Sequence, residues 1–204
     1  MGFYDRHVLP RLVDLTCGSA ALFPIRQWAC EGLSGDVVEL GFGSGRNVGA
    51  YPGAVSSVAA IEPSDTAWTL AADRVASASI DITRSGLDGE RIPFADNTFD
   101  AALSTFTLCT IPDPRAAVDE VIRVVKDGGS LHFLEHGLAP DEHVRRWQRR
   151  LDPIERRVAG GCHLTRDVTR ELTDAGLTIT SIKQFYGARP KSLGFLSVGV
   201  ARVG

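Results

Sequence analysis

Short apolar runs alternate with helical patterns from Asp36 to the end of the chain. Seven runs rich in β-branched and other apolar residues are typical of buried strands, at 36–40, 57–61, 79–83, 99–105, 130–135, 177–185 and 195–203. Apolar residues recur at helical spacing between several of these runs, at 64–76, 114–125 and 164–176. Strands that alternate with helices predict a mostly parallel sheet with helices on both faces. The last two runs have no helix between them, so they predict an antiparallel pair at one edge.

Two further segments predict helices outside this alternation. Residues 1–34 carry apolar residues at helical spacing and predict an N-terminal helical cap. Residues 138–164 predict a helical lid inserted after the fifth strand. The length of the chain predicts a single domain over 1–204. The apolar stripe of the lid comprises Val144, Trp147, Leu151, Ile154 and Val158, and arginines flank it. The pattern favours a lid that buries this stripe, and it leaves open a transient contact with an anionic membrane surface.

Composition and charge limit the classes of partner. The net charge of −3 gives no overall basic field, so we expect no nucleic-acid partner. No stretch approaches the ~18 consecutive apolar residues of a membrane span, and the charged start of the chain is unlike a signal peptide. We therefore expect a cytoplasmic monomer or dimer. The four cysteines, Cys17, Cys30, Cys109 and Cys162, are far apart and form no CxxC pair, so we expect neither a metal site nor a disulfide framework.

A glycine-rich turn, "GFGSG", follows the first predicted strand. Ligands of open parallel sheets bind beyond the strand ends, and Gly41, Gly43 and Gly45 would let a ligand approach the main chain closely. The spacing is not GxGxxG, because the third glycine of that fingerprint is absent. Glu62 ends the second strand, where a carboxylate either binds both hydroxyls of a ribose or simply lies at a helix N-terminus. Together the turn and Glu62 favour a nucleoside ligand.

Four successive segments carry a family resemblance. In order, "ELGFGSG", "IEPS", "DGERIPFADNTFDAAL" and "VIRVVKDGGSLHFLEHG" resemble the motifs of class I S-adenosylmethionine-dependent methyltransferases, over residues 36–137. The resemblance implies a Rossmann-like, seven-stranded, mostly parallel sheet with an antiparallel C-terminal hairpin. It also implies S-adenosylmethionine as cofactor and S-adenosylhomocysteine as product.

The resemblance further assigns roles in cofactor binding. Glu39 and the three glycines of the turn would surround the methionyl part, and Glu62 would bind the ribose hydroxyls. Asp88 would accept a hydrogen bond from the adenine amino group, beside the backbone of Gly89. The other expected cofactor contacts are Phe42, which packs either on the cofactor or in the core, with Pro63, Ser104 and Thr105.

Later segments narrow the acceptor. "STFTLCTI", "HFLEHGLA" and "LDPIERRVAGGCHLTRD" are similar to the methyltransferase-like 7 group, whose animal members are thiol S-methyltransferases. This similarity implies methyl transfer to a small apolar acceptor, with a thiol favoured. A phospholipid or quinone methyltransferase is an alternative, as is a non-catalytic partner subunit that binds S-adenosylmethionine. His136 and His163 are the candidate catalytic residues, or else structural histidines, and Cys109 and Cys162 are expected to fill the core.

Overall fold

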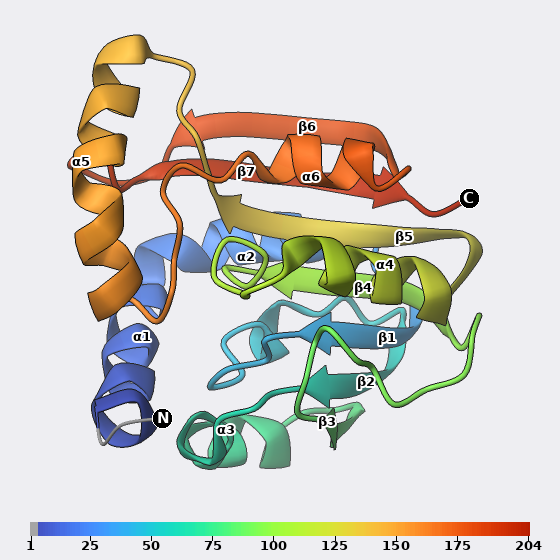
Figure 1. Cartoon of the computed structure of the whole chain (residues 1–204). Helices are drawn as coiled ribbons and strands as arrows, with labels where there is room; N and C mark the ends of the chain where they lie inside the picture. The colour runs from blue at the N-terminus through green and yellow to red at the C-terminus, as the bar shows by residue number, and fades with distance from the viewer. Residues whose placement is uncertain (1–3) are drawn as a thin grey trace.

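A seven-stranded sheet in the order β3-β2-β1-β4-β5-β7-β6 forms the centre of the protein, whose computed structural model describes residues 4–204 (Figure 1). Strand β7 is antiparallel to its neighbours β5 and β6, and the other adjacent pairs are parallel. This confirms the predicted mostly parallel sheet with an antiparallel C-terminal hairpin. The strands are β1 (Gly35–Leu40), β2 (Val55–Ile61), β3 (Asp81–Gly86), β4 (Phe99–Thr105), β5 (Val125–His136), β6 (Thr178–Tyr186) and β7 (Phe195–Arg202).

Helices pack on both faces of the sheet and at one end of it. Helices α4 and α6 lie on one face, and their apolar residues share a core cluster with Val38, Leu40 and Phe133. The opposite face carries the alternate residues, such as Val37 and Leu103, as the period of two in a strand requires. The helices are α1 (Leu9–Cys17), α2 (Phe23–Cys30), α3 (Asp65–Ala76), α4 (Pro114–Val124), α5 (Glu142–Val158) and α6 (Val168–Asp174).

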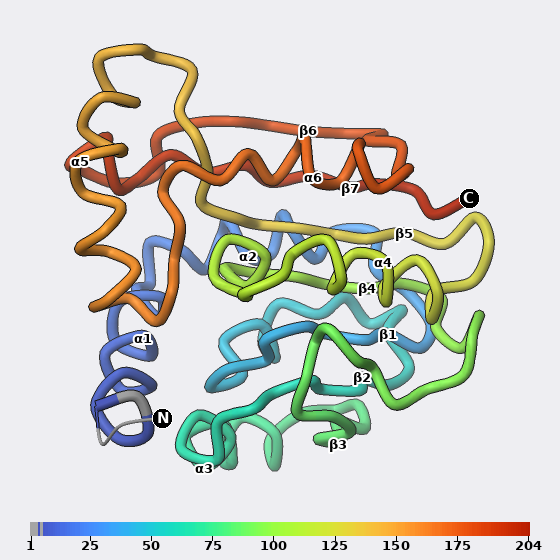
Figure 2. The backbone as a smooth tube through the Cα atoms, in the orientation of Figure 1, coloured from blue at the N-terminus to red at the C-terminus, as the bar shows by residue number. Residues whose placement is uncertain are grey.

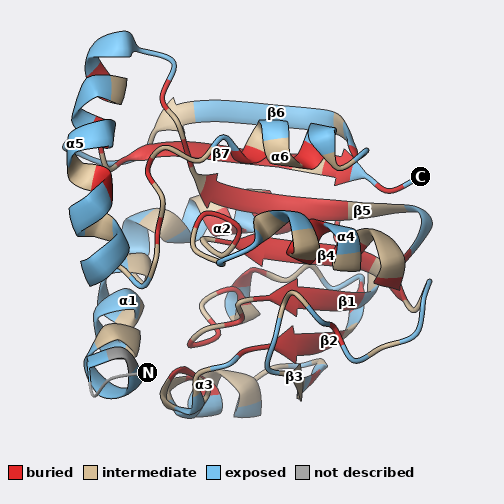
Figure 3. Cartoon of the chain, in the orientation of Figure 1, coloured by how far each residue is buried: buried red, intermediate tan, exposed pale blue. Residues whose placement is uncertain are grey.

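Burial is greatest in the middle of the sheet. Strands β1, β4 and β5 are largely buried, whereas the edge strand β6 is largely exposed (Figure 3). The parallel strands end on the side where α1 and α5 stand, as the trace in Figure 2 shows. Because β1 pairs with both β2 and β4, the strand order reverses at β1. The glycine turn after β1 therefore lies at the switch point where open α/β sheets bind ligands.

The apolar stripe predicted on the lid is only partly buried. Trp147, Ile154 and Val158 are 46%, 57% and 45% exposed, so the expectation that they pack inward is wrong. The face of α5 that packs inward instead carries Val144, Gln148 and Asp152. The physical reason is that α5 stands at the end of the sheet and touches it along a narrow face.

Hydrogen bonds of a buried glutamine fix that face of α5. The amide nitrogen of Gln148 donates to the carbonyl of Gly137 (2.9 Å), and its amide oxygen accepts from the N–H of Ala139 (3.0 Å). Gln148 therefore ties the helix to the segment that leaves β5. Asp152, one turn later, accepts from both the N–H and the hydroxyl of Thr165 (3.2 Å each).

The chain passes from α4 into β5 without a glycine cap. Helix α4 ends at Val124 and β5 begins at Val125. Gly128, with φ of +76°, instead lies in an irregular stretch early in β5, where its N–H donates to the carbonyl of Val203 (2.8 Å). A register shift between β4 and β5 accommodates the extra residues.

Within residues 4–204, no single helix is long and apolar enough to cross a bilayer. One bent pair, Arg6–Cys17 with Ala20–Cys30 at 59°, meets the length and composition of a span only when its two helices are taken together.

We predict that Gln148→Ala destabilises the protein, because it leaves two buried backbone groups without partners. Each unsatisfied buried group costs about 1–3 kcal/mol, so we expect the free energy of unfolding to fall by at least that amount. The control is His143→Ala on the exposed face of α5, for which we expect a change within about 0.5 kcal/mol. Urea denaturation measures both, and equal stability of the two variants would contradict the anchoring role of Gln148.

Candidate functional site

The glycine turn adopts a backbone that only glycine takes easily. Gly41, Gly43 and Gly45 have φ of +63°, +59° and +74°. A Cβ on Gly41 would lie 2.0 Å from the Thr107 hydroxyl oxygen, so this glycine allows close packing against the chain after β4. A Cβ on Gly43 would meet only the carbonyl oxygen of Gly41, at 3.8 Å. Gly43 is thus the point of the turn where bare backbone is open to a ligand.

A buried carboxylate from the next strand holds this turn. Glu62, only 5% exposed, accepts hydrogen bonds from the N–H of Gly43 (2.6 Å) and the N–H of Ser64 (2.7 Å). Burial raises the pKa of Glu62, against the lowering effect of the N–H groups of Ser64 and Gly43 and the charge of Arg84. Each carboxylate oxygen has a second lone pair, so Glu62 can still accept from ribose hydroxyls. Pro63 follows it and is exposed.

These features fit S-adenosylmethionine. The cofactor carries no phosphate, so it needs close approach to the backbone and acceptors for hydroxyl and amino groups rather than an anion cradle. The open backbone at Gly43 and the carboxylate of Glu62 offer both, side by side. The geometry is therefore compatible with the cofactor-binding roles that the resemblance implies for Gly43 and Glu62, and those roles remain predictions.

Glu39 lies beneath the turn in a buried polar network. Its side chain is fully buried, and it accepts from the amide of Asn47 (2.9 Å) and from the hydroxyl of Tyr51. The Asn47 amide also donates to the hydroxyl of Thr105 (2.9 Å). Burial raises the pKa of Glu39 to about 7, despite the lowering effect of Tyr51, Asn47 and Arg26. Both oxygens of Glu39 thus already hold the chain after the turn.

Arg26 joins this network from the N-terminal cap. Its guanidinium donates to the side-chain oxygen of Asn47 (2.7 Å), the hydroxyl of Thr105 (3.1 Å) and the carbonyl of Cys17 (3.0 Å). Burial lowers the pKa of Arg26. Nothing in the sequence singles out Arg26, because its role depends on how α2 packs against the strand ends.

A second buried carboxylate organises the chain after β4. Glu135 is fully buried and accepts from the hydroxyl of Ser104 (2.7 Å), so the expected cofactor contact Ser104 faces a neighbouring strand. Glu135 also accepts from the N–H groups of Thr107 (3.2 Å), Leu108 (3.1 Å) and Cys109 (3.0 Å). An acid at a strand end is the same signal that marked Glu62, so the sequence contained the clue to Glu135.

The predicted adenine contacts lie beyond β3. Asp88 is exposed, and its carboxylate accepts from the N–H of Glu90 (2.9 Å). A Cβ on Gly89 would lie 3.0 Å from the side chain of Ile111 and 3.7 Å from that of Leu40. Gly89 therefore approaches the end of β1, on the same side of the sheet as the turn. Phe42 is buried and its ring lies 5.4 Å from that of Trp68, so it has a core contact.

The two candidate histidines lie close to the same loop after β4. His136 is half-buried at the end of β5, with its ring 4.9 Å from the ring of Phe106. Phe106 has φ of +57°, uncommon for a side chain of its size, and its ring also lies 5.3 Å from the guanidinium carbon of Arg26. The backbone N–H of His163 donates to the carbonyl of Cys109 (2.8 Å). The fold thus brings both histidines to the strand ends.

The two histidines have opposite pKa shifts. Burial lowers the pKa of His163, and the charges of Arg166 and Arg156 lower it further. Burial alone would lower the pKa of His136, but its contacts with Cys109 and the charge of Glu135 outweigh burial and raise it.

Comparisons with known proteins find similarity to methyltransferases. The Methyltransferase domain family matches residues 38–133. The thiol S-methyltransferase TMT1B of Homo sapiens is 30% identical over 176 residues, which are 82% of this chain and 69% of the human protein. The phosphatidylethanolamine N-methyltransferase of Cereibacter sphaeroides is 26% identical over 129 residues, 61% of this chain and 63% of that protein. The match spans only 62% of the length of TMT1B from Rattus norvegicus.

Solved structures show the same fold at low sequence identity. A geranyl diphosphate methyltransferase in complex with S-adenosylmethionine superposes with a TM-score of 0.71 at 13% identity, covering 90% of this chain and 85% of that chain. At this identity the likeness concerns the fold alone.

We predict that the buried Glu39 makes stability depend on pH. The pKa of Glu39 is about 7 in the folded chain, against about 4.3 when unfolded. The folded state therefore keeps a proton that the unfolded state releases, and stability falls as the pH rises from about 4.5 to about 7. Glu39→Gln lacks this titration, so its stability relative to wild type should rise across that window, by up to about 4 kcal/mol. Urea denaturation at several pH values measures this, and a constant difference would contradict the prediction.

Proposed function

Because this chain belongs to the class I S-adenosylmethionine-dependent methyltransferases, we propose that it transfers the cofactor's methyl group to the sulfur of a small apolar thiol. One observation carries the choice of acceptor. The similarity to a thiol S-methyltransferase covers 176 residues, so it extends well beyond the matched domain at 38–133. The parts of such enzymes outside the cofactor-binding domain are where substrate-specific contacts are expected.

The residues at the strand ends would hold the cofactor. The backbone at Gly43 and the carboxylate of Glu62 would bind the ribosyl and methionyl parts, and the segment with Asp88 and Gly89 would bind adenine. Glu39 and Thr105 support the turn through Asn47, so their expected role becomes one of positioning. When bound, S-adenosylmethionine supplies a methyl group on a sulfonium centre, activated for in-line displacement.

The acceptor makes modest chemical demands on the protein. A thiol has a pKa of about 8.5 and is already a few per cent thiolate near pH 7. The acceptor loses its proton to an imidazole or to water, its sulfur forms a bond to the methyl carbon, and the carbon–sulfonium bond breaks. His136 and His163, which lie beside the loop after β4, are the candidate acceptors of that proton. No covalent enzyme intermediate is needed, so alignment of the sulfur is the main task of the site.

A phospholipid acceptor is the second candidate. The exposed apolar side chains of α5, Trp147 and Ile154, lie on a helix rich in exposed arginines, which suits the surface of an anionic membrane. The similarity to a phosphatidylethanolamine N-methyltransferase supports this alternative, although it covers a smaller share of the chain than the match to the human thiol enzyme.

We predict that Glu62→Gln weakens binding of S-adenosylmethionine by about 1–3 kcal/mol, because a neutral amide replaces a charged acceptor. The NH₂ of the new amide would also face one of the two backbone N–H groups, of Gly43 and Ser64, that now donate to Glu62, and two donors cannot pair. Asp73→Asn, an exposed carboxylate change on α3, is the matched control and should bind as wild type. Calorimetry measures both, with circular dichroism as a check of folding, and unchanged affinity of Glu62→Gln would reject the ribose assignment.

The acceptor is identified by release of S-adenosylhomocysteine. We expect release that depends on hydrogen sulfide or small alkyl thiols, and little release with vesicles containing phosphatidylethanolamine or with a reduced quinone. Release only with vesicles would reject the thiol and select the phospholipid, and release only with the quinone would select a quinone acceptor. Cofactor binding without release in any arm would favour the non-catalytic subunit.

A further inference from the structure

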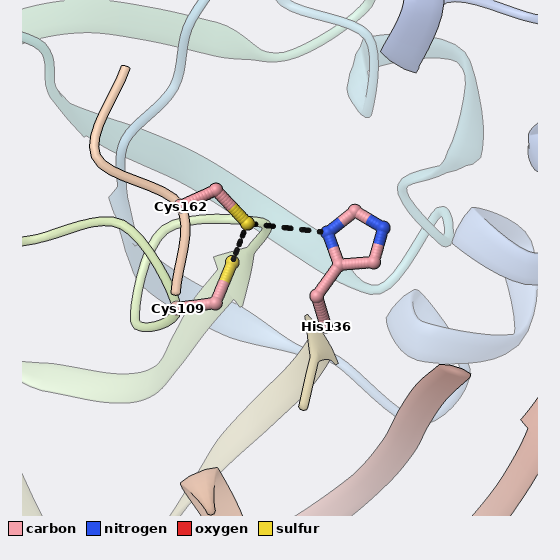
Figure 4. Close-up of side chains that lie close together, drawn as sticks. All are labelled: Cys109, His136 and Cys162. Atoms are coloured by element: carbon pink, nitrogen blue, oxygen red, sulfur yellow. Dashed lines mark hydrogen bonds between the residues drawn. The ribbon is translucent and has the colours of Figure 1, made fainter. Parts of the chain in front are cut away.

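Two cysteines and a histidine from three separate segments meet beside the strand ends. Cys109 follows β4, His136 ends β5, and Cys162 comes after α5 (Figure 4). The sulfur of Cys162 lies 3.7 Å from the sulfur of Cys109 and 3.7 Å from Nδ1 of His136. One ligand atom from each of the three residues lies within 4.8 Å of the others. Cys109 and Cys162 are buried and have free thiols.

The two separations from Cys162 are those of ligands around a tetrahedral metal ion. Bonds of about 2.3 Å to sulfur and about 2.0–2.1 Å to nitrogen place two tetrahedral sulfur ligands about 3.8 Å apart, and a sulfur and a nitrogen about 3.5 Å apart. The observed 3.7 Å separations from Cys162 agree with both values. A disulfide would instead require the sulfurs to approach to about 2.05 Å.

Backbone contacts hold the donors in place independently of their side chains. The carboxylate of Glu135 fixes the N–H of Cys109 from one side, and the N–H of His163 donates to the Cys109 carbonyl from the other. Gly161, with φ of +97°, lets the chain pass so close that a Cβ there would lie 3.0 Å from the carbonyl oxygen of Thr110. These contacts bring Cys162 onto the loop of Cys109, so the three donors converge without any metal-induced rearrangement.

We propose that Cys109, His136 and Cys162 bind a thiophilic divalent metal ion, Zn²⁺ by the chemistry of the donors, and leave its fourth position for the sulfur of the acceptor. Thiolates and imidazole select zinc over the oxygen-preferring magnesium or calcium. Among residues 4–204, the cluster holds three donors, which is the number in sites that keep an open position. From sequence spacing alone no metal site is expected, because no two of these cysteines are close along the chain.

The fourth position suits the acceptor of the proposed function, and this part of the inference rests on that function. As the acceptor sulfur binds the metal, its S–H bond breaks and the proton leaves to solvent. The bound thiolate then receives the methyl group, and the product is a neutral thioether, a weaker ligand than the thiolate. His136 acts here as a ligand, which leaves His163 as the other candidate catalytic histidine.

Cobalt replaces zinc as a spectroscopic probe of the site. We expect the reduced, chelator-treated protein to bind one Co²⁺ per chain, with a thiolate-to-cobalt charge-transfer band and the strong visible bands of tetrahedral cobalt. Mutation of a residue that only supports a metal ligand typically lowers metal affinity by about 10–100-fold. Because Cys109→Ser and Cys162→Ser each remove a ligand itself, we expect each to lower the affinity for Co²⁺ by more than that. Cys30→Ala, at a buried cysteine in another core cluster, is the matched control and should bind as wild type. No stoichiometric binding, or binding unaffected by the serine variants, would overturn the site.

Folding and the proposed function are tested apart from metal binding. Circular dichroism and calorimetric binding of S-adenosylmethionine show whether each variant is folded, and His136→Gln gives a third, less buried ligand change. The cobalt titration requires no methyl transfer, so it reports on the metal site even where thiol methylation is not found. Full thiol methylation by the metal-free protein would overturn the role of the ion in the reaction and leave the proposed function standing.

The fourth position is tested by adding ethanethiol to the cobalt-loaded protein. A third thiolate ligand should intensify the charge-transfer band, with half-saturation near the KM for ethanethiol. A band that stays unchanged at saturating thiol would overturn the assignment of the fourth position.

Discussion

Three glutamates buried at the ends of β2, β1 and β5 are the constraint on which the site depends. A carboxylate withdrawn from water is costly unless donors surround it, so each of these side chains must fix the chain that faces it. Glu62 fixes the glycine turn, Glu39 fixes the segment after that turn, and Glu135 fixes the loop after β4. The loops that would otherwise be mobile are thereby pinned to the rigid sheet.

This arrangement couples two halves of the candidate site. Glu62 and Glu39 shape the part that fits S-adenosylmethionine, while Glu135 holds the backbone of Cys109 and with it the Cys/His cluster. The ring of Phe106 contacts both parts of the site, because it lies near Arg26 of the Glu39 network and near His136 of the Cys/His cluster. Methyl transfer requires a methyl donor and an acceptor in line. The two loops follow the adjacent strands β1 and β4, so holding both of them against the sheet fixes their relative position.

Helices α1 and α5, which stand at the end of the sheet, leave several apolar side chains exposed. Helix α1 has no buried residue, and Leu12 and Leu15 on it are 41% and 74% exposed. Helix α5 is held through polar contacts of Gln148 and Asp152 and leaves Trp147 exposed. Both helices stand at the strand ends, so an apolar acceptor or a lipid surface would meet exposed apolar side chains beside the site.

The sequence by itself determined the seven strands, their mostly parallel pairing and the positions of the glycine turn and Glu62, because periodicity and turn chemistry are local properties. It also placed α3 and α4 to within one residue at each end, and it placed α6 inside a longer predicted helix at 164–176. Only the tertiary structure decided that α5 packs through Gln148, that Arg26 enters the network of Glu39, and that Cys109, His136 and Cys162 converge. Those contacts join residues far apart in the chain, so their geometry depends on how the strands and helices pack and leaves no local pattern to read.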